Sequence, residues 1–154
     1  MLPNQLILSL LEEAYRQKTW HGPNLKQSLK GVSGRQAAWR PAPGCHNIWE
    51  LALHAAYWKY AVRRKLDQGK RVSFALKGSN FYERPETGKA TEAAWRSDLA
   101  ILEKEHRLLA ESIRRFLGKP SLGKTAPHAL WNCVSRYIPR GPDSLAAAPS
   151  RGLI

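Results

Sequence analysis

The pattern of apolar and polar residues predicts three long helices, and the clearest of them covers residues 47–64. Asn47 suits the N-cap of this helix, because its side-chain oxygen can accept a hydrogen bond from a free amide of the first turn. Apolar residues then recur at steps of three and four, which places them on one face that we expect to be buried. That face consists of Ile48, Leu51, Ala55, Trp58 and Val62, and His54 lies at its edge.

Two further helices are predicted over residues 4–18 and 91–117. The buried side of the first is expected to hold Leu6, Leu10, Leu11 and Ala14, and its solvent side Glu12, Glu13, Arg16 and Gln17. The apolar seam of the longest helix, which is typical of a helical bundle, consists of Trp95, Leu99, Leu102, His106, Leu109, Ile113 and Phe116.

The connecting segments carry recognisable turn and cap signals. A turn or two of helix is predicted over residues 24–29, and Ser33 with Gln36 has the spacing of a capping box before a short helix over residues 35–39. Residues 69–90 form a long polar loop that contains Phe74 and Phe81. Such a loop often covers a functional site, but it also fits a crossover that only packs its aromatic rings on the bundle.

The helical pattern fails after Pro120. Three long helices leave one apolar groove uncovered, and no fourth amphipathic segment follows to fill it. The predicted fold is therefore an all-α, up-down four-helix bundle whose fourth helix is degraded or missing. We assign residues 1–118 to the bundle and residues 119–154 to an atypical, poorly ordered tail.

Composition narrows the class of protein. A chain of 154 residues with 43% hydrophobic residues can form one domain with a real core. No apolar run is long enough to span a membrane and no signal peptide is evident, so a cytoplasmic protein is expected. The net charge of +13 permits nucleic-acid binding, but the basic residues are spread along the chain without a block of five like charges, so we do not expect it.

Three histidines and a cysteine are candidates for chemistry. His54 and His106 both lie on or beside predicted core faces, where an imidazole is either a hydrogen-bonded core residue or a ligand. Cys45 and His46 stand just before a helix N-terminus, where a thiol can become reactive. They are equally consistent with two ordinary loop residues. Cys45 and Cys133 are too far apart in sequence to form a metal-type pair.

Three features together resemble the DinB-like superfamily of four-helix-bundle metalloproteins, which includes thiol transferases. They are the Trp-Arg-Pro connector at residues 39–41, the helix with a central histidine at residues 47–64, and the Trp-to-His helix within residues 92–109. The resemblance covers roughly residues 5–117. It implies that the family's metal, in an intact member, lowers the pKa of a bound thiol or water and polarises the substrate.

By this resemblance His54 matches the first of three histidine ligands for a divalent metal such as nickel or zinc. Trp58 and His106 are then expected as pocket neighbours. The family's other two ligands form an H-x-x-x-H pair on the fourth helix, and this sequence has no such pair. Its only histidine after the long helix is His128, in a different local context.

The C-terminal sequence suggests a reason for the missing pair. Residues 134–153 can be encoded by synonymous codons that, when translated one base later, give a segment like the family's fourth helix. Our hypothesis is that the C-terminus, from a point between residues 123 and 134, is a one-base frameshift of that helix.

The function expected from these features is that of a DinB-like metal-dependent enzyme of the thiol or small-molecule transferase class. With one of three ligands present, we expect weak or absent metal binding. The uncovered groove predicts a homodimer. The alternative is a non-catalytic binding module with a basic surface.

Overall fold

The computed structural model describes residues 3–17, 22–67 and 73–117. Every regular element within them is a helix: α1 (Pro3–Tyr15), α2 (Leu25–Leu29), α3 (Gly34–Ala38), α4 (Ile48–Leu66), the 3-10 helix η1 (Thr87–Lys89) and α5 (Glu92–Leu117). This confirms the all-α class. The fourth helix, the tail and the frameshift fall on residues outside the described part, so they stay predictions.

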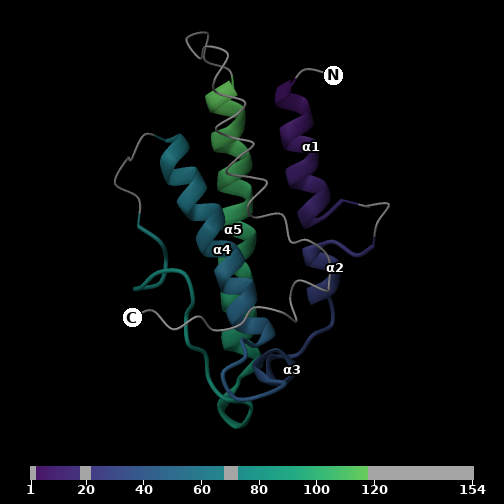
Figure 1. The fold of residues 1–154 in the computed structure, drawn as a ribbon, viewed down its shortest axis with the longest axis vertical. Coiled ribbons are helices and arrows are strands. Elements are labelled where there is room, and N and C mark those ends of the chain that lie inside the picture. The colour runs from purple at the N-terminus through teal and green to yellow at the C-terminus, as the bar shows by residue number, and fades with distance from the viewer. Residues whose placement is uncertain (1–2, 18–21, 68–72, 118–154) are drawn as a thin grey trace.

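The long helices α4 and α5 form a central pair, and α1 packs along α5 (Figure 1). The short helices α2 and α3 lie toward the end of the molecule where α4 and α5 both begin. Helices α4 and α5 therefore run parallel, as the successive contacts Trp49–Asp98 and Asp67–Ser112 also show, so the predicted up-down order does not hold between them. At their common start, α3 contacts α4, α5 and η1. In the described part of the chain, no helix combines the length and the apolar character needed to cross a membrane.

The predicted helix starts are confirmed at the level of individual hydrogen bonds. Asn47 caps α4 by accepting a hydrogen bond from the backbone N–H of Glu50 at 2.8 Å. Ser33 and Gln36 form the expected capping box of α3. A second capping box, between Asn24 and Gln27, begins α2 in the segment predicted to be helical.

The buried face of α4 differs from the predicted one. Ile48 is 37% exposed, and Leu51, Ala55 and Trp58 are only half-buried. The side chains that enter the core are instead Trp49, Ala52, Leu53, Ala56 and Tyr60, together with the predicted Val62. The helix has apolar residues on two adjacent faces, and packing decides between them: the Trp49 ring meets the Trp95 ring of α5 edge-on at 5.3 Å.

The prediction for α1 also needs correction. Leu6 is 48% exposed, whereas Glu12, expected in solvent, is buried. The stripe that enters the core consists of Ile7, Leu11 and Tyr15, which are spaced four residues apart. Burial of Glu12 is tolerated because Arg16 donates to its carboxylate and His106 lies beside it.

The seam of α5 is confirmed at Trp95, Leu102, His106, Leu109 and Ile113, which are all buried, whereas the predicted Leu99 and Phe116 are half-buried. The core that it organises consists of two apolar clusters. One gathers around Trp49, Leu53 and Trp95, and the other around Leu11, Val62 and Ile113. Two groups of ionisable side chains accompany these clusters: His106 with Lys59 and Glu12, and Arg63 with Glu105. We call these five residues together the polar layer.

The long loop between α4 and α5 is described from residue 73 and contains only η1 as a regular element. Phe74 packs against the first apolar cluster, as the crossover interpretation expects. Phe81 does not join that cluster. Its ring lies against histidine side chains at the edge of α4, as the other interpretation, a loop that covers a site, would require.

Candidate functional site

His54 projects from the second turn of α4 toward the loop at residues 80–81. Its Nδ1 lies 3.1 Å from the backbone oxygen of Asn80. A carbonyl oxygen only accepts hydrogen bonds, so Nδ1 carries the proton and Nε2 keeps the lone pair. Burial is the main cause that lowers the pKa of His54, and the charge of His46 lowers it further. His54 is therefore a neutral imidazole whose Nε2 can act as a ligand or a base.

Asn80 holds this corner of the loop in place. Its backbone adopts a φ of 68°, the left-handed region that is uncommon for residues other than glycine. In this conformation its carbonyl accepts from His54, and its side-chain oxygen accepts from the Trp58 indole N–H at 3.2 Å. The structure thus brings His54 and Trp58 together, with their rings edge-on at 6.2 Å.

Phe81 lies between two histidines. Its ring is nearly parallel to the His54 ring at a centroid distance of 4.1 Å, and to the His46 ring at 3.7 Å. Two rings this close and this parallel would overlap if they shared one face of Phe81, so they occupy opposite faces. The loop therefore separates the two imidazoles with a hydrocarbon ring.

His46 is also fixed from the other side. Its Nδ1 lies 2.9 Å from the Glu50 carboxylate, which is buried and also paired with the Arg40 guanidinium. Burial raises the pKa of Glu50, but the hydrogen bonds from Arg40 and His46 outweigh it and hold that pKa below its usual value. These contacts pair His46 with Glu50 and Phe81 rather than with the exposed thiol of Cys45.

His106, which was expected as a pocket neighbour of His54, does not lie beside it. It is fully buried and stacks on the Tyr15 ring at 4.0 Å. Its Nδ1 lies 3.3 Å from Lys59 Nζ, which donates to it, and its Nε2 lies 3.5 Å from Glu12. Because His54 and Lys59 are five positions apart on α4, the two side chains leave the helix about 140° apart. His106 therefore belongs to the polar layer.

The electrostatics of the polar layer are unusual. Burial, together with the charge of Lys59, lowers the pKa of His106 to about 4, although Glu12 acts in the opposite direction. Burial likewise lowers the pKa of Lys59 to about 8. Next to this group, Arg63 donates to the buried Glu105 carboxylate at 3.0 Å from Nη2 and 3.1 Å from Nε. These five groups were not predicted to meet.

A metal site is incomplete in the described part of the chain. Nowhere in residues 3–17, 22–67 and 73–117 do three His, Cys, Asp or Glu side chains come together to hold an ion. His54 offers one oriented nitrogen, and His46 is separated from it by Phe81. These residues alone do not fit a tightly held metal.

Sequence reasoning missed Asn80, Glu50 and Arg40 as neighbours of the histidines. A weak signal for Asn80 was present: the Gly-Ser-Asn run at residues 78–80 favours a turn, and asparagine tolerates a positive φ. Nothing local in the sequence indicates that Phe81 would insert between His46 and His54, because that contact joins residues more than twenty positions apart.

Comparison with known proteins gives one result. A model of the DinB superfamily matches residues 17–138, which is well over half of the chain. Neither the curated proteins nor the solved structures yield a match. The matched region includes α4 with His54, the loop that covers it and the whole of α5. On this evidence the chain belongs to the DinB superfamily.

Proposed function

We propose that this protein is a metal-deficient member of its family, built on the fold of a metal-dependent thiol or small-molecule transferase. The observation that supports it is the hydrogen bond from His54 Nδ1 to the Asn80 carbonyl. Metal-ligating histidines commonly donate their second N–H to a carbonyl or carboxylate, which orients the ligating nitrogen. His54 has this orientation, but the sequence lacks the paired histidines that would complete the ligand set.

The test is an isothermal calorimetric titration of the full-length, metal-free protein with Ni²⁺ and, separately, with Zn²⁺. Weak binding, with the metal lost on gel filtration, is the expected result. His54→Gln should remove what binding there is. His46→Gln is the matched control, because it removes the neighbouring imidazole and should leave that binding in place.

Two outcomes would contradict this proposal. Tight binding of one metal ion per chain would show that the ligand set is complete and the protein is not metal-deficient. Equal metal binding by the wild-type protein and His54→Gln would show that His54 is not a ligand.

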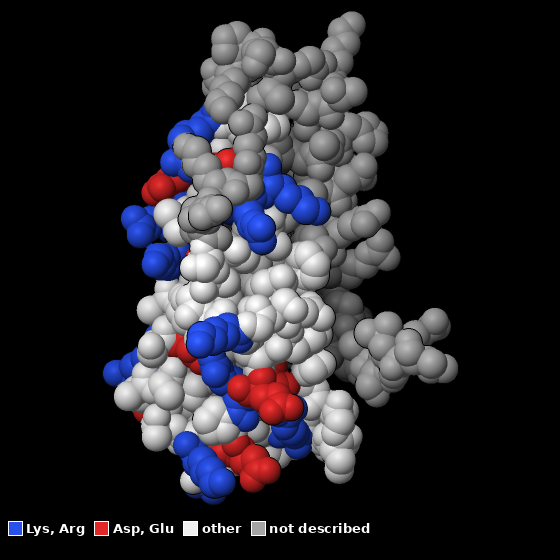
Figure 2. All heavy atoms as spheres, turned by 90° about the vertical axis from the view of Figure 1, so that its left-hand side faces the viewer, with Lys and Arg blue, Asp and Glu red and all other residues white. Residues whose placement is uncertain are grey.

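The net charge of +13 favours a second candidate, a non-catalytic module that binds an acidic partner. On the face formed by α4 and the loop, Figure 2 shows Lys and Arg around an uncharged centre, with Asp and Glu among them. Because the charges are mixed, we favour an acidic protein partner over a nucleic acid. A second copy of this chain carries the same positive charge, so the predicted homodimer rests on the uncovered apolar groove and not on charge. Light scattering coupled to gel filtration, repeated at low and high salt, distinguishes a dimer from a monomer.

A further inference from the structure

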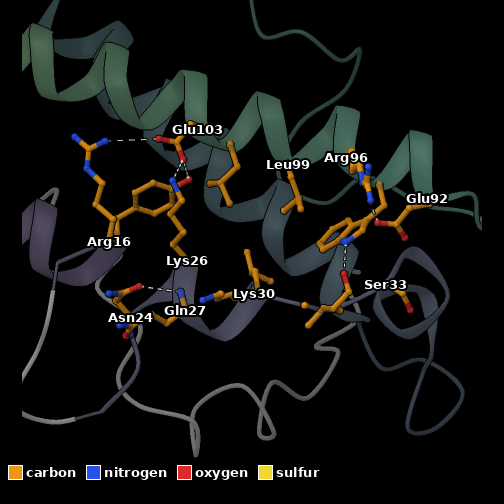
Figure 3. A pocket seen from close by; sticks show the side chains of 16 residues that line it. Arg16, Asn24, Lys26, Gln27, Lys30, Ser33, Glu92, Arg96, Leu99 and Glu103 are labelled. Carbon is orange, nitrogen blue, oxygen red and sulfur yellow. Dashed lines mark hydrogen bonds and ion pairs between the residues drawn. The ribbon is translucent and has the colours of Figure 1, made fainter.

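A groove of about 740 Å³ lies on the side of α5 that faces α2 (Figure 3). We call it the α2–α5 groove. One wall is a stripe of α5 from Glu92 to Glu103, and the other is formed by α2 and the segment that leads to Ser33. Because a helix rises 1.5 Å per residue, this stripe gives the groove a length of about 16 Å. Neither His54 nor Phe81 lines it, so it is distinct from the site described above.

The floor of the groove is apolar. It is lined by Leu29, Val32, Leu99 and Leu102, with Trp95 at one end. The Trp95 indole N–H donates to the Val32 carbonyl at 2.7 Å, so the polar edge of this ring is already satisfied. The ring is only 1% exposed, so it closes this end of the groove and leaves the partly buried Leu29, Val32 and Leu99 as the apolar surface for a bound molecule. Such a surface suits an extended hydrocarbon body.

The rim of the groove is positive. Four cations line it, Arg16, Lys26, Lys30 and Arg96, against the two carboxylates of Glu92 and Glu103. The carboxylates already have donors. Glu103 accepts from the Tyr15 hydroxyl and from Lys26, both at 2.9 Å, and Glu92 accepts from the Gly34 N–H at 2.8 Å.

Two of the cations can serve a ligand. Lys30 is exposed on the rim, and no described hydrogen bond or ion pair engages its ammonium group. Lys26 is 55% exposed, and its ammonium group has three donors, of which Glu103 takes one. These two lysines lie on the same wall, four residues apart at α2.

We propose that the α2–α5 groove binds a carboxylate with an apolar tail, with Lys26 and Lys30 at the carboxylate and the leucine floor under the tail. The excess of cations on the rim selects an anion over a cation of the same shape. The length and the apolar floor select an unbranched body over a compact polar one. This binding is independent of the metal chemistry proposed for His54.

Calorimetric titration of the full-length protein with decanoate tests the charge selection, and decyltrimethylammonium is the matched cationic probe. Decanoate is expected to bind and the cation is not. Hexanoate should bind more weakly than decanoate by up to about fourfold for each missing methylene. Failure of decanoate to bind, equal affinity for the two ten-carbon probes, or equal affinity for hexanoate and decanoate would each overturn the proposal.

A pair of variants tests the position of the carboxylate. Lys26→Gln with Lys30→Gln should weaken decanoate binding at least about fivefold, as expected for lost charge-assisted hydrogen bonds at an exposed site. Lys104→Gln with Arg107→Gln removes the same charge from exposed positions of α5 that do not line the groove, and it should leave the affinity unchanged. Equal weakening in the two variants would show a net-charge effect, and no weakening in the first would place the carboxylate elsewhere; either result overturns the proposal.

Discussion

A single residue in an uncommon backbone conformation sets the chemistry available at His54. Asn80, with a φ of 68°, presents its carbonyl to His54 and its side-chain oxygen to Trp58. The carbonyl determines which imidazole nitrogen is protonated, so the tautomer of His54 is a property of the loop. Any ligand or base role of His54 must therefore use Nε2.

The neighbouring Phe81 makes a prediction about the same histidine. Burial is the largest cause of the lowered pKa of His54, and the Phe81 ring covers one face of that imidazole. Phe81→Ala should admit water and raise the pKa of His54 toward its ordinary value. An NMR titration of the histidine ring signals measures the change.

Phe74→Ala is the control for this experiment, since Phe74 belongs to the same loop but packs against Tyr57, Tyr60 and Tyr82. It should leave the pKa of His54 where it is. If both variants move this pKa equally, the effect comes from the loop as a whole. The shielding role of Phe81 would then be wrong.

At the scale of elements, the start of α3 lies unusually close to the start of α5. A Cβ atom added to Gly34 would stand 2.9 Å from the Thr91 carbonyl oxygen and 3.2 Å from Trp95 Cβ. The first of these atoms is backbone and cannot move aside cheaply. The Gly34 N–H also donates to Glu92, so the two helix starts are joined by a direct hydrogen bond.

Gly34→Ala is therefore expected to lower the free energy of unfolding by about 1–3 kcal/mol. Helix propensity alone predicts the opposite sign, because alanine favours a helix over glycine by about 1 kcal/mol. Gly88→Ala is the matched control, since a Cβ there meets nothing within 4 Å. Urea denaturation of both variants decides the matter, and a stabilised Gly34→Ala would refute the close contact.

At the scale of the whole molecule, the polar layer brings charged side chains into the interior. It holds a buried ion pair, Arg63 with Glu105, and the group formed by Lys59, His106 and Glu12. Buried charges of this kind add little net stability, because desolvation offsets much of their attraction. They do make stability depend on pH.

The sign of that dependence follows from His106. Its pKa is about 4 in the folded protein and ordinary in the unfolded chain, so the unfolded state binds more protons between these values. Stability is then fully present above the ordinary histidine pKa and is lost as the pH falls toward 4. The expected loss from this group by pH 4 is about 3 kcal/mol.

His106→Gln isolates this contribution. The glutamine side chain can accept from Lys59 and donate to Glu12, but it does not titrate. Denaturant unfolding between pH 7 and pH 4 should show a shallower loss of stability in the variant than in the wild-type protein. Equal slopes would mean that other groups cause the acid sensitivity and that His106 is not held neutral by its surroundings.

The sequence by itself determined the helices, their starts and the seam of α5. Caps such as Asn47 with the N–H of Glu50, or Ser33 with Gln36, join residues three positions apart, so their chemistry is visible in a short window. The period of α5 is equally local. The family signature was also present in the sequence, and the match to the DinB superfamily confirms it.

Only the tertiary structure decided which face of α4 is buried, that Glu12 is buried, and which residues surround each histidine. These outcomes depend on residues far apart in the chain: Trp49 with Trp95, His106 with Glu12, and Phe81 with both His46 and His54. The periodicity of a single helix shows which of its faces are apolar. When two faces are almost equally apolar, the contacts with neighbouring helices decide which one is buried. Local patterns therefore fix the elements, and packing between distant segments fixes the sites.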